Sequence, residues 1–525
     1  MKDDPTACYH ALKSHDTRFD GVFYVGVTST GIYCRPICPA KTPKEDNCRF
    51  FDSAEAAEKE SFRPCLRCKP ELAPGNAPVD DARRIAHLLA QRIDEGLIDD
   101  GASLEDIASE FDLSSRQIRR IIKSELGVTP IELMQTRRLL LAKQLLTQTK
   151  LPIIEIAFAS GFSSLRRFND SFSSRYRMPP TRLRKEAAEQ KTLAEPHESS
   201  TLQLSYRPPY DWDSILEFLS GRIVKGTDWI AEGAYHRTVR LGKHTGWIAV
   251  SHAPAQRSLL VRFTHSLTPV LPALLGRLRH LFDLSARPDL IAAQLSKDPL
   301  LHSSLELNPG LRVPGAFDGF ELAVRAILGQ QVTVKAATTL SCRFVEAFGE
   351  KIDTPFPELH RLSPLPERIA EATIDSIARL GIISARAKSI IALSQAVASG
   401  DLQLDAGAHP EKVIEKLVAL PGIGPWTAHY IAMRALRWPD AFPKEDIAVR
   451  NNLGGVTAKQ AETMSHAWSP WRSYAVLHIW KNNPASAIEP KAPSPRSSRP
   501  LDLHPPHFSS PTDSSGLQEV EDQVS

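Results

Sequence analysis

The sequence lacks any run of about 18 apolar residues, so it predicts no membrane-spanning helix and no membrane partner. Its opening residues, Met1–Pro5, have no apolar core of the kind that a signal peptide needs. Cysteine is scarce, with 7 among 525 residues. We therefore expect a cytosolic protein, in whose reducing compartment cysteines serve as metal ligands or nucleophiles before they form disulfides.

The chain as a whole also lacks a large excess of either charge, because its net charge is only +3. Positive charge is instead concentrated from Ser114 to Glu186, which holds 15 Lys and Arg against 5 Asp and Glu. This local excess favours a surface that faces DNA phosphates, with a solvated helical face as the alternative.

Two helix-turn-helix patterns lie in this basic region. The first begins at a Ser103 cap, turns near Asp112 and continues into a basic helix at Ser115. The second follows about 46–50 residues later, with a turn at Gly161. The candidate DNA contacts on the two second helices are Arg116, Arg119, Arg120, Arg166 and Arg167.

Four of the cysteines have the spacing of a metal site. Cys34 and Cys38 form a C-x3-C pair, Cys65 and Cys68 form a C-x2-C pair, and 26 residues separate the pairs. Such spacing places two thiolates on each of two turns and suits tetrahedral Zn²⁺, for which a purely structural zinc knuckle is the simpler interpretation. Cys48 is a weaker candidate ligand at the start of a predicted strand. The two cysteines that we expect to be ordinary buried thiols are Cys8 and Cys342.

The segment LPGIGPWTAHY predicts a helix end, a tight glycine turn and a second helix. Gly422 and Gly424 allow a positive φ and close backbone approach, and the N–H groups that open the second helix can bind a DNA phosphate. Trp426 and Tyr430 share one helix face, and Asp446 follows sixteen residues later. An aromatic wall near one carboxylate suits a base flipped out of a duplex; a glycine turn with two core aromatics is the alternative.

The residues around the four cysteines resemble the N-terminal domain of the Ada family of methylation-response proteins. The resemblance is carried by the segments 30–36 and 62–68. It implies that Cys34 is both a zinc ligand and the acceptor of a methyl group from a DNA methylphosphotriester, since zinc holds the thiol as a nucleophilic thiolate. The arginines that would hold the DNA backbone are Arg35, Arg63 and Arg67.

The paired helix-turn-helix patterns, with the closing segment 176–180, resemble the AraC-type DNA-binding domain. This resemblance implies a transcriptional activator of alkylation-repair genes, with promoter DNA and RNA polymerase as partners. Ada proteins usually end in a second methyltransferase with a Pro-Cys-His-Arg active site. The sequence has no such motif, so repair of O6-methylguanine is not predicted.

Residues 203–483 resemble AlkA, the 3-methyladenine DNA glycosylase II family, over nearly the whole of that enzyme. The matching segments are 206–212, 320–331, the glycine hairpin and 471–480. The resemblance implies that Asp446 is the catalytic aspartate, which stabilises positive charge developing on the sugar. Glu445 is the rival carboxylate.

The same resemblance assigns the base pocket. Its aromatic residues are Trp426, Tyr430, Trp480 and Phe218, which attract a cationic alkylated base. Trp426 stands where bifunctional relatives carry a Schiff-base lysine, which predicts a monofunctional enzyme. Gln331 stands where the family inserts a leucine wedge into DNA. Ile447 and Ala448 replace a tyrosine and a leucine of the pocket.

Together these features predict a multidomain α+β protein that binds double-stranded DNA and Zn²⁺. The expected parts are a small zinc and methyl-acceptor domain (1–76), an all-α double helix-turn-helix domain (80–187), a linker (188–202), an α+β, TBP-like subdomain (203–312), an all-α helix-hairpin-helix glycosylase core (313–484) and a disordered tail (485–525). Two alternatives stay open. In the first, the chain is only a transcription regulator, and its glycosylase-like half is a catalytically weak DNA-binding module. In the second, it is only a repair enzyme, and its N-terminal half tethers the enzyme to DNA.

Overall fold

The computed structural model describes residues 5–15, 23–51, 54–68, 85–86, 89–90, 92–93, 105, 108, 113–188, 198–405 and 408–481. The predicted tail and most of the predicted helix over 103–112 lie outside these residues. Within the described part, no helix combines the length and the hydropathy needed to cross a membrane.

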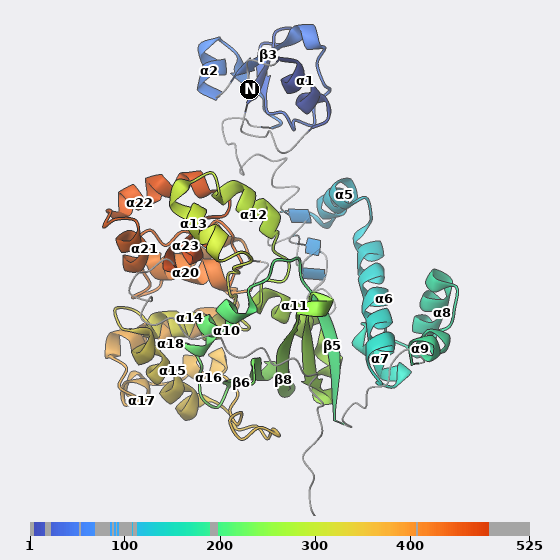
Figure 1. The fold of residues 1–525 in the computed structure, drawn as a ribbon, viewed down its shortest axis with the longest axis vertical. Coiled ribbons are helices and arrows are strands. Elements are labelled where there is room, and N and C mark those ends of the chain that lie inside the picture. Colours follow the sequence, from blue (N-terminus) through green and yellow to red (C-terminus); the bar gives the residue numbers. More distant parts are fainter. Residues whose placement is uncertain are drawn as a thin grey trace, which may run out of the picture. The chain divides into compact units, whose positions relative to one another are not determined.

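The N-terminal domain is a small mixed sheet with a helix beside it (Figure 1). Its elements are α1 (Pro5–Lys13), β1 (Tyr24–Val27), β2 (Ile32–Cys34), η2 (Glu45–Asn47), β3 (Cys48–Phe51), α2 (Ala54–Lys59) and β4 (Arg63–Pro64). The strand order is β3-β1-β2-β4. The parallel pairing of β2 with β4 sets Tyr33 opposite Pro64. Because Cys34 and Cys65 come next on the two strands, this register brings the two cysteine pairs together.

The basic region forms the expected helices. They are α5 (Ser115–Leu126), α6 (Pro130–Gln148), α7 (Ile153–Ala159), α8 (Leu165–Tyr176) and α9 (Pro180–Ala188). Ser114 and Gln117 form a capping box that starts α5, and Ser164 caps α8. The inner face of α8 buries Phe168 and Phe172 and leaves the basic face outside.

The next subdomain is built on a five-stranded antiparallel sheet, drawn in green in Figure 1, with the order β5-β9-β8-β7-β6. Its elements are β5 (Ser199–Ser205), α10 (Trp212–Ser220), β6 (Asp228–Ala231), β7 (Ala234–Leu241), β8 (His244–Ala253), η4 (Pro254–Gln256), β9 (Ser258–Thr264), η5 (His265–Val270) and α11 (Leu271–Leu281). Residues 199–202, expected in the linker, instead open β5, where Ser199 pairs with Thr264. Ser199 and Ser200 are buried in this strand, and the Ser200 hydroxyl lies 3.1 Å from Nε2 of His265, so a hydrogen bond satisfies it. Buried and outward side chains alternate only from Thr201 onwards.

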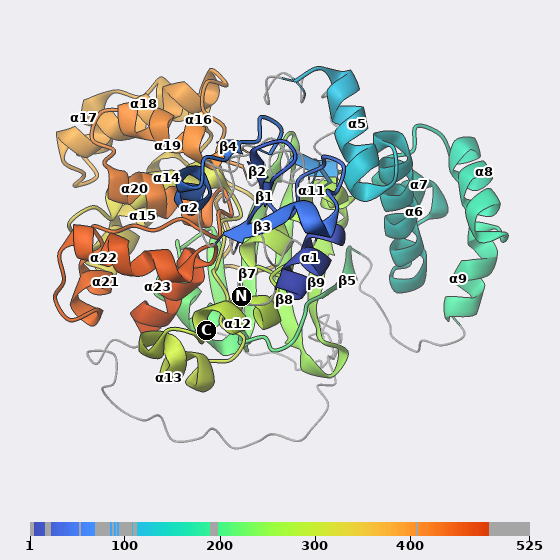
Figure 2. The ribbon, with the colours of Figure 1, turned by 90° about the horizontal axis from the view of Figure 1, so that it is seen from above.

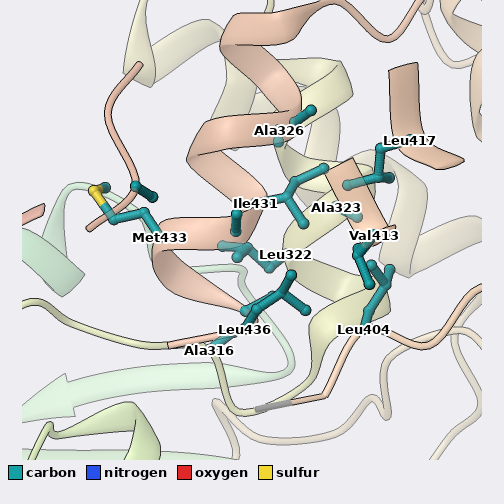
Figure 3. Close-up of a cluster of buried hydrophobic side chains, with 14 of the residues drawn as sticks. Ala316, Leu322, Ala323, Ala326, Leu404, Val413, Leu417, Ile431, Met433 and Leu436 are labelled. Atoms are coloured by element: carbon teal, nitrogen blue, oxygen red, sulfur yellow. The ribbon is translucent and has the colours of Figure 1, made fainter. Parts of the chain in front are cut away.

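The remaining described chain is almost all helix, as predicted. Its elements are α12 (Pro288–Leu295), α13 (Pro299–Leu307), α14 (Gly319–Leu328), α15 (Val334–Phe348), α16 (Pro366–Ala370), α17 (Ile374–Ala378), α18 (Ser384–Ala398), α19 (Pro410–Ala419), α20 (Pro425–Arg434), α21 (Ile447–Asn452), α22 (Ala458–Ser465), η6 (His466–Trp468) and α23 (Arg472–Lys481). Figures 1 and 2 show α20 close to α14 and α23. Figure 3 shows the core between α14 and α20, where Ile431 of α20 meets Leu322 and Ala323 of α14. This packing fixes α20, which carries the predicted pocket residues Trp426 and Tyr430.

Candidate functional site

The predicted glycine hairpin joins α19 to α20. Gly422 has φ +76°, and a Cβ there would lie 2.3 Å from the Ser389 hydroxyl oxygen, so both the backbone and the space require glycine. Gly424 differs from the expectation, because its φ is −90° as the N-cap of α20. No atom among the described residues comes within 4 Å of a Cβ at Gly424, so its face is open to an approaching backbone.

Asp446 is held by three N–H groups. It caps α21, and its Oδ1 accepts a bond of 2.9 Å from the Val449 backbone N–H. Its Oδ1 also accepts from the Trp480 indole at 3.1 Å, while Oδ2 accepts from the Trp426 indole at 2.9 Å. The side chain is almost fully buried, so these donors replace water and keep the carboxylate fixed. The buried Oε2 of Glu445 accepts no hydrogen bond from the described residues.

The predicted aromatic residues gather around this carboxylate. Trp426 and Tyr430 stack with ring centroids 5.5 Å apart and planes 12° apart, as their spacing predicted. Trp480 reaches the site from α23. Phe218 of α10 belongs to the same group, because Arg434 lies 4.8 Å from its ring and 5.6 Å from the Tyr430 ring. The four aromatics therefore come from three helices of two subdomains.

Three arginines behind the aromatic wall were missed by the sequence analysis. Arg434 donates a 2.7 Å hydrogen bond to the Tyr430 hydroxyl, and Arg222 stacks 3.7 Å from the centre of the Phe218 ring. Arg325 donates to the backbone carbonyl of Arg222 at 2.9 Å. A signal was present for two of them, because Arg222 and Arg434 each follow a pocket aromatic by four residues.

Gln331 lies in the exposed turn after α14 and has a left-handed φ of +54°. The preceding Gln330 amide donates to the Gly422 carbonyl at 2.9 Å and to the Thr427 hydroxyl at 3.1 Å. These bonds tie the turn to the glycine hairpin, so Gln331 and the hairpin share one surface. Ile447 is 71% exposed beside Asp446, an apolar residue open to solvent.

The four predicted metal ligands form one cluster. The Sγ atoms of Cys34, Cys38, Cys65 and Cys68 all lie within 4.8 Å of one another. Tetrahedral Zn–S bonds of about 2.3 Å require sulfur atoms roughly 3.8 Å apart, close to the 3.9 Å between Cys38 and Cys65. The cluster therefore fits Zn²⁺.

Cys34 differs from the other three ligands because it is partly exposed whereas they are buried. Cys48 lies outside the cluster and donates to the Lys44 carbonyl at 3.4 Å. Cys8 is buried as predicted, but Cys342 of α15 is only partly buried, with its thiol 3.9 Å from the Ile223 carbonyl, so the prediction of burial is wrong for it. The expectation that Arg35 helps to hold the DNA backbone is also wrong, because Arg35 is fully buried.

The five predicted DNA-contacting arginines of the helix-turn-helix region are all exposed. Arg119 lies 3.9 Å from Glu105, and Arg166 lies 3.9 Å from Asp170. Solvated ion pairs of this kind stabilise the fold by at most about 1 kcal/mol, so DNA phosphates can replace the carboxylates. Contacts to individual bases depend on the DNA sequence.

Four family models match successive parts of the chain. They are the metal binding domain of Ada (residues 7–71), a helix-turn-helix domain (107–186), the AlkA N-terminal domain (201–318) and the HhH-GPD superfamily base excision DNA repair protein (324–473). Their order follows the sequence of domains described above.

Two curated relatives cover different lengths of the chain. A probable bifunctional transcriptional activator/DNA repair enzyme AlkA of Mycobacterium tuberculosis is 39% identical over 91% of this chain and 97% of its own. The DNA-3-methyladenine glycosylase 2 of Escherichia coli is 36% identical over 53% of this chain and 95% of its own. A solved 3-methyladenine DNA-glycosylase from Archaeoglobus fulgidus aligns with a TM-score of 0.48 and 18% identity, over 53% of this chain and 97% of its own.

Proposed function

Because the chain belongs to the family of bifunctional transcriptional activator/DNA repair enzymes, with Ada-type, helix-turn-helix and AlkA-type domains, we propose how its residues divide the work. Asp446 is the catalytic carboxylate of a monofunctional DNA glycosylase that hydrolyses the N-glycosidic bond of alkylated purines of the 3-methyladenine type. The observation that carries this assignment is the buried Asp446 carboxylate, fixed by two indole N–H groups of the pocket.

Release of the base leaves positive charge on the sugar, and stabilising this charge speeds the reaction. The bond from C1′ to the base nitrogen breaks, and its electron pair leaves with the base. Asp446 stabilises the positive charge left on the sugar, and water then adds to C1′ and loses a proton, which leaves an abasic site. An alkylated base is already cationic and leaves readily, so one carboxylate suffices where ordinary glycosidases use two. Trp426 has no amine for a Schiff base, so the strand stays uncut.

The pocket and the hairpin bind damaged DNA in this proposal. Trp426, Tyr430, Trp480 and Phe218 receive the flipped-out base. The backbone at Gly422 and Gly424 and the N–H groups that start α20 face a DNA phosphate. Gln331, on the same surface, enters the space that the flipped-out base leaves.

Cys34 is the methyl acceptor of the zinc domain. Its sulfur attacks the methyl carbon of a methylphosphotriester; the S–C bond forms, the C–O bond breaks, and the phosphate oxygen keeps the electron pair as a phosphodiester. The Zn²⁺ held by Cys34, Cys38, Cys65 and Cys68 maintains the thiolate form before the transfer. Cys34 is the ligand residue of the four that is partly exposed, whereas Cys38, Cys65 and Cys68 are buried, which supports its role. Methylation removes one negative charge from the cluster and raises its affinity for DNA.

The helix-turn-helix domain then activates alkylation-repair genes. Arg116, Arg119, Arg120, Arg166 and Arg167 contact promoter DNA, and RNA polymerase is the partner that the activator recruits. The reduced thiolates of the zinc cluster and the DNA substrate agree with a cytosolic protein.

The decisive experiment is base release from methylated duplex DNA by the full chain, compared with Asp446→Asn and the matched Glu445→Gln. We expect free 3-methyladenine from the wild type and from Glu445→Gln, none from Asp446→Asn, and strand cleavage only after alkali. If the wild type binds the lesion but releases no base, the protein is a transcription regulator with a glycosylase-like binding module.

A further inference from the structure

Three arginines act on the hydroxyl of Tyr430. Arg434 comes from the same helix and donates to the Tyr430 oxygen at 2.7 Å. Arg222 follows α10, and Arg325 comes from α14; both lie close enough for their charges to act on Tyr430. The Tyr430 ring also stacks on Trp426, whose indole is bonded to Asp446.

These guanidinium groups are bonded to neutral oxygen atoms. Arg434 donates from Nε to the Pro314 carbonyl at 2.7 Å and from Nη2 to the Gly315 carbonyl at 3.0 Å, and its side chain is buried. Arg222 donates to the Phe218 carbonyl at 2.9 Å. Arg325 donates to the Arg222 carbonyl at 2.9 Å and to the Thr338 hydroxyl at 2.8 Å. Within the described part of the chain, none of the three is within ion-pair distance of a carboxylate.

The nearest acidic side chains already have another cation. Asp228 and Glu321 lie towards Arg325, but Arg237 sits 3.8 Å from the Asp228 carboxylate and 2.9 Å from that of Glu321. Tyr235 and Ser363 add hydrogen bonds to these carboxylates. The positive charge behind the pocket wall therefore exceeds the negative charge, and burial makes such an imbalance costly.

This imbalance opposes the chemistry assigned to the pocket. An alkylated base that carries a positive charge must approach the aromatic wall, with three guanidinium groups directly behind it. Among the residues that the structure describes, the acidic group hydrogen-bonded to this cluster is the phenol of Tyr430, whose ring stacks on Trp426 in the pocket wall.

We propose that Tyr430 ionises within the arginine cluster and that its phenolate makes the pocket prefer cationic over neutral alkylated bases. The inference rests on the proposed glycosylase function. It adds a specificity-determining group, because a phenolate offers a negative charge that a neutral aromatic ring lacks. A cationic base then binds the phenolate form of Tyr430 more tightly than the neutral phenol, so its binding is coupled to release of the Tyr430 proton.

The electrostatics of the site agree with this geometry. Burial alone raises the pKa of Tyr430, but the charges of Arg434, Arg222 and Arg325 and the Arg434 hydrogen bond overcome burial and lower it to about 8. Above that pH the phenolate predominates, and below it the neutral phenol does. The preference for cationic bases therefore increases as the pH rises through this value.

The first test is an ultraviolet titration of the full chain, which detects tyrosinate and needs no catalysis. We expect one tyrosine to ionise near pH 8 in the wild type and none there in Tyr430→Phe. Tyr206→Phe is the matched control, because burial raises the pKa of Tyr206 and its loss leaves the step in place. In Arg222→Met the step moves to higher pH, a result that does not depend on how well Tyr430→Phe folds. A wild type without this step overturns the proposal.

The second test measures the lesion preference in the Asp446→Asn background, so that base release does not interfere. The affinity for duplex DNA with 7-methyladenine, whose positive charge is fixed because its ring has no acidic N–H, is divided by that for the same duplex with neutral 1,N6-ethenoadenine. We expect this ratio to rise roughly tenfold from about pH 6.5 to about pH 9, and to rise much less when Tyr430→Phe is added. Neither base loses a proton over this range, so the change in the ratio reports the protein.

Equal pH dependence of the ratio with and without Tyr430 overturns the proposal. Failure of the wild type to release base in the decisive experiment above overturns the proposed function instead. The two failures are distinguishable because the titration and the binding ratio use no base release.

Discussion

The indole N–H of Trp426 donates a 2.9 Å hydrogen bond to Oδ2 of Asp446, so a wall of the pocket is also a support of its carboxylate. The Trp480 indole does the same for Oδ1 at 3.1 Å. A base that packs on these rings is therefore placed beside an oriented carboxylate. This arrangement links recognition of the base to stabilisation of the charged sugar.

The indole N–H groups can be tested without removing the aromatic faces. Trp426→Phe and Trp480→Phe keep a ring in the pocket but each remove one indole donor from Asp446. Oδ2 then loses its Trp426 donor, whereas Oδ1 keeps the Val449 N–H when the Trp480 indole is removed. We expect each to lower the single-turnover rate of base release by roughly tenfold, with a smaller effect on lesion affinity. Trp247→Phe, in the sheet of the α+β subdomain, is the control and should leave the rate unchanged. Equal rates in all three variants would show that the indole bonds do not orient Asp446.

The sequence predicts the local parts of this site well. The four-residue spacing of Trp426 and Tyr430 is enough to place both rings on one face of α20, and the stacking confirms it. Likewise, the cysteine spacing is enough to predict the sulfur cluster. These features depend on backbone periodicity and on short turns.

Relations between distant segments are less accessible from sequence. The bond from Trp480 to Asp446 depends on the packing of α23 against α21, and the position of Arg325 behind Tyr430 depends on the packing of α14 against α20. Gly424 shows a second limit. A glycine in a turn suggests a positive φ, but Gly424 has an ordinary negative φ, and what distinguishes it is the open space where a Cβ would lie. The role of a glycine therefore depends on its neighbours in space.

The two hairpin glycines should respond differently to alanine. Gly422→Ala imposes a side chain at φ +76° and against the Ser389 hydroxyl, so we expect it to lower the free energy of unfolding by about 1–3 kcal/mol. Gly424→Ala meets neither obstacle and should leave stability almost unchanged, while its methyl group hinders the DNA backbone and weakens binding. Denaturant unfolding and duplex binding of both variants measure the two effects. Similar stability losses would contradict the assignment of the turn.

Substitution of the exposed Gln331 tests whether this side chain fills the space that the flipped-out base leaves in the duplex. Gln331→Ala shortens the side chain at the tip of the turn without touching the Gln330 bonds that hold it. We expect several-fold weaker binding to a duplex with an abasic site and little change on undamaged duplex, whereas Gln331→Leu restores an apolar wedge and keeps the preference. Gln395→Ala, an exposed glutamine of α18, is the control. Loss of affinity for both duplexes alike would indicate a backbone contact instead of a wedge.

A substitution in the zinc cluster tests whether the N-terminal half senses damage or only tethers the glycosylase to DNA. Cys34→Ser removes the sulfur that accepts the methyl group, while the three buried ligands and the sheet register between β2 and β4 remain. We expect no methyl-bearing cysteine by mass spectrometry after incubation with methylphosphotriester DNA, and no induction of repair genes, but unchanged base release. Cys48→Ser should behave as the wild type, because the Cys48 thiol lies outside the cluster.

Chelation of the metal should abolish methyl transfer in both the wild type and Cys48→Ser, because the thiolate form depends on Zn²⁺. If Cys34→Ser still induces the genes, the front half tethers the glycosylase to DNA and does not sense damage.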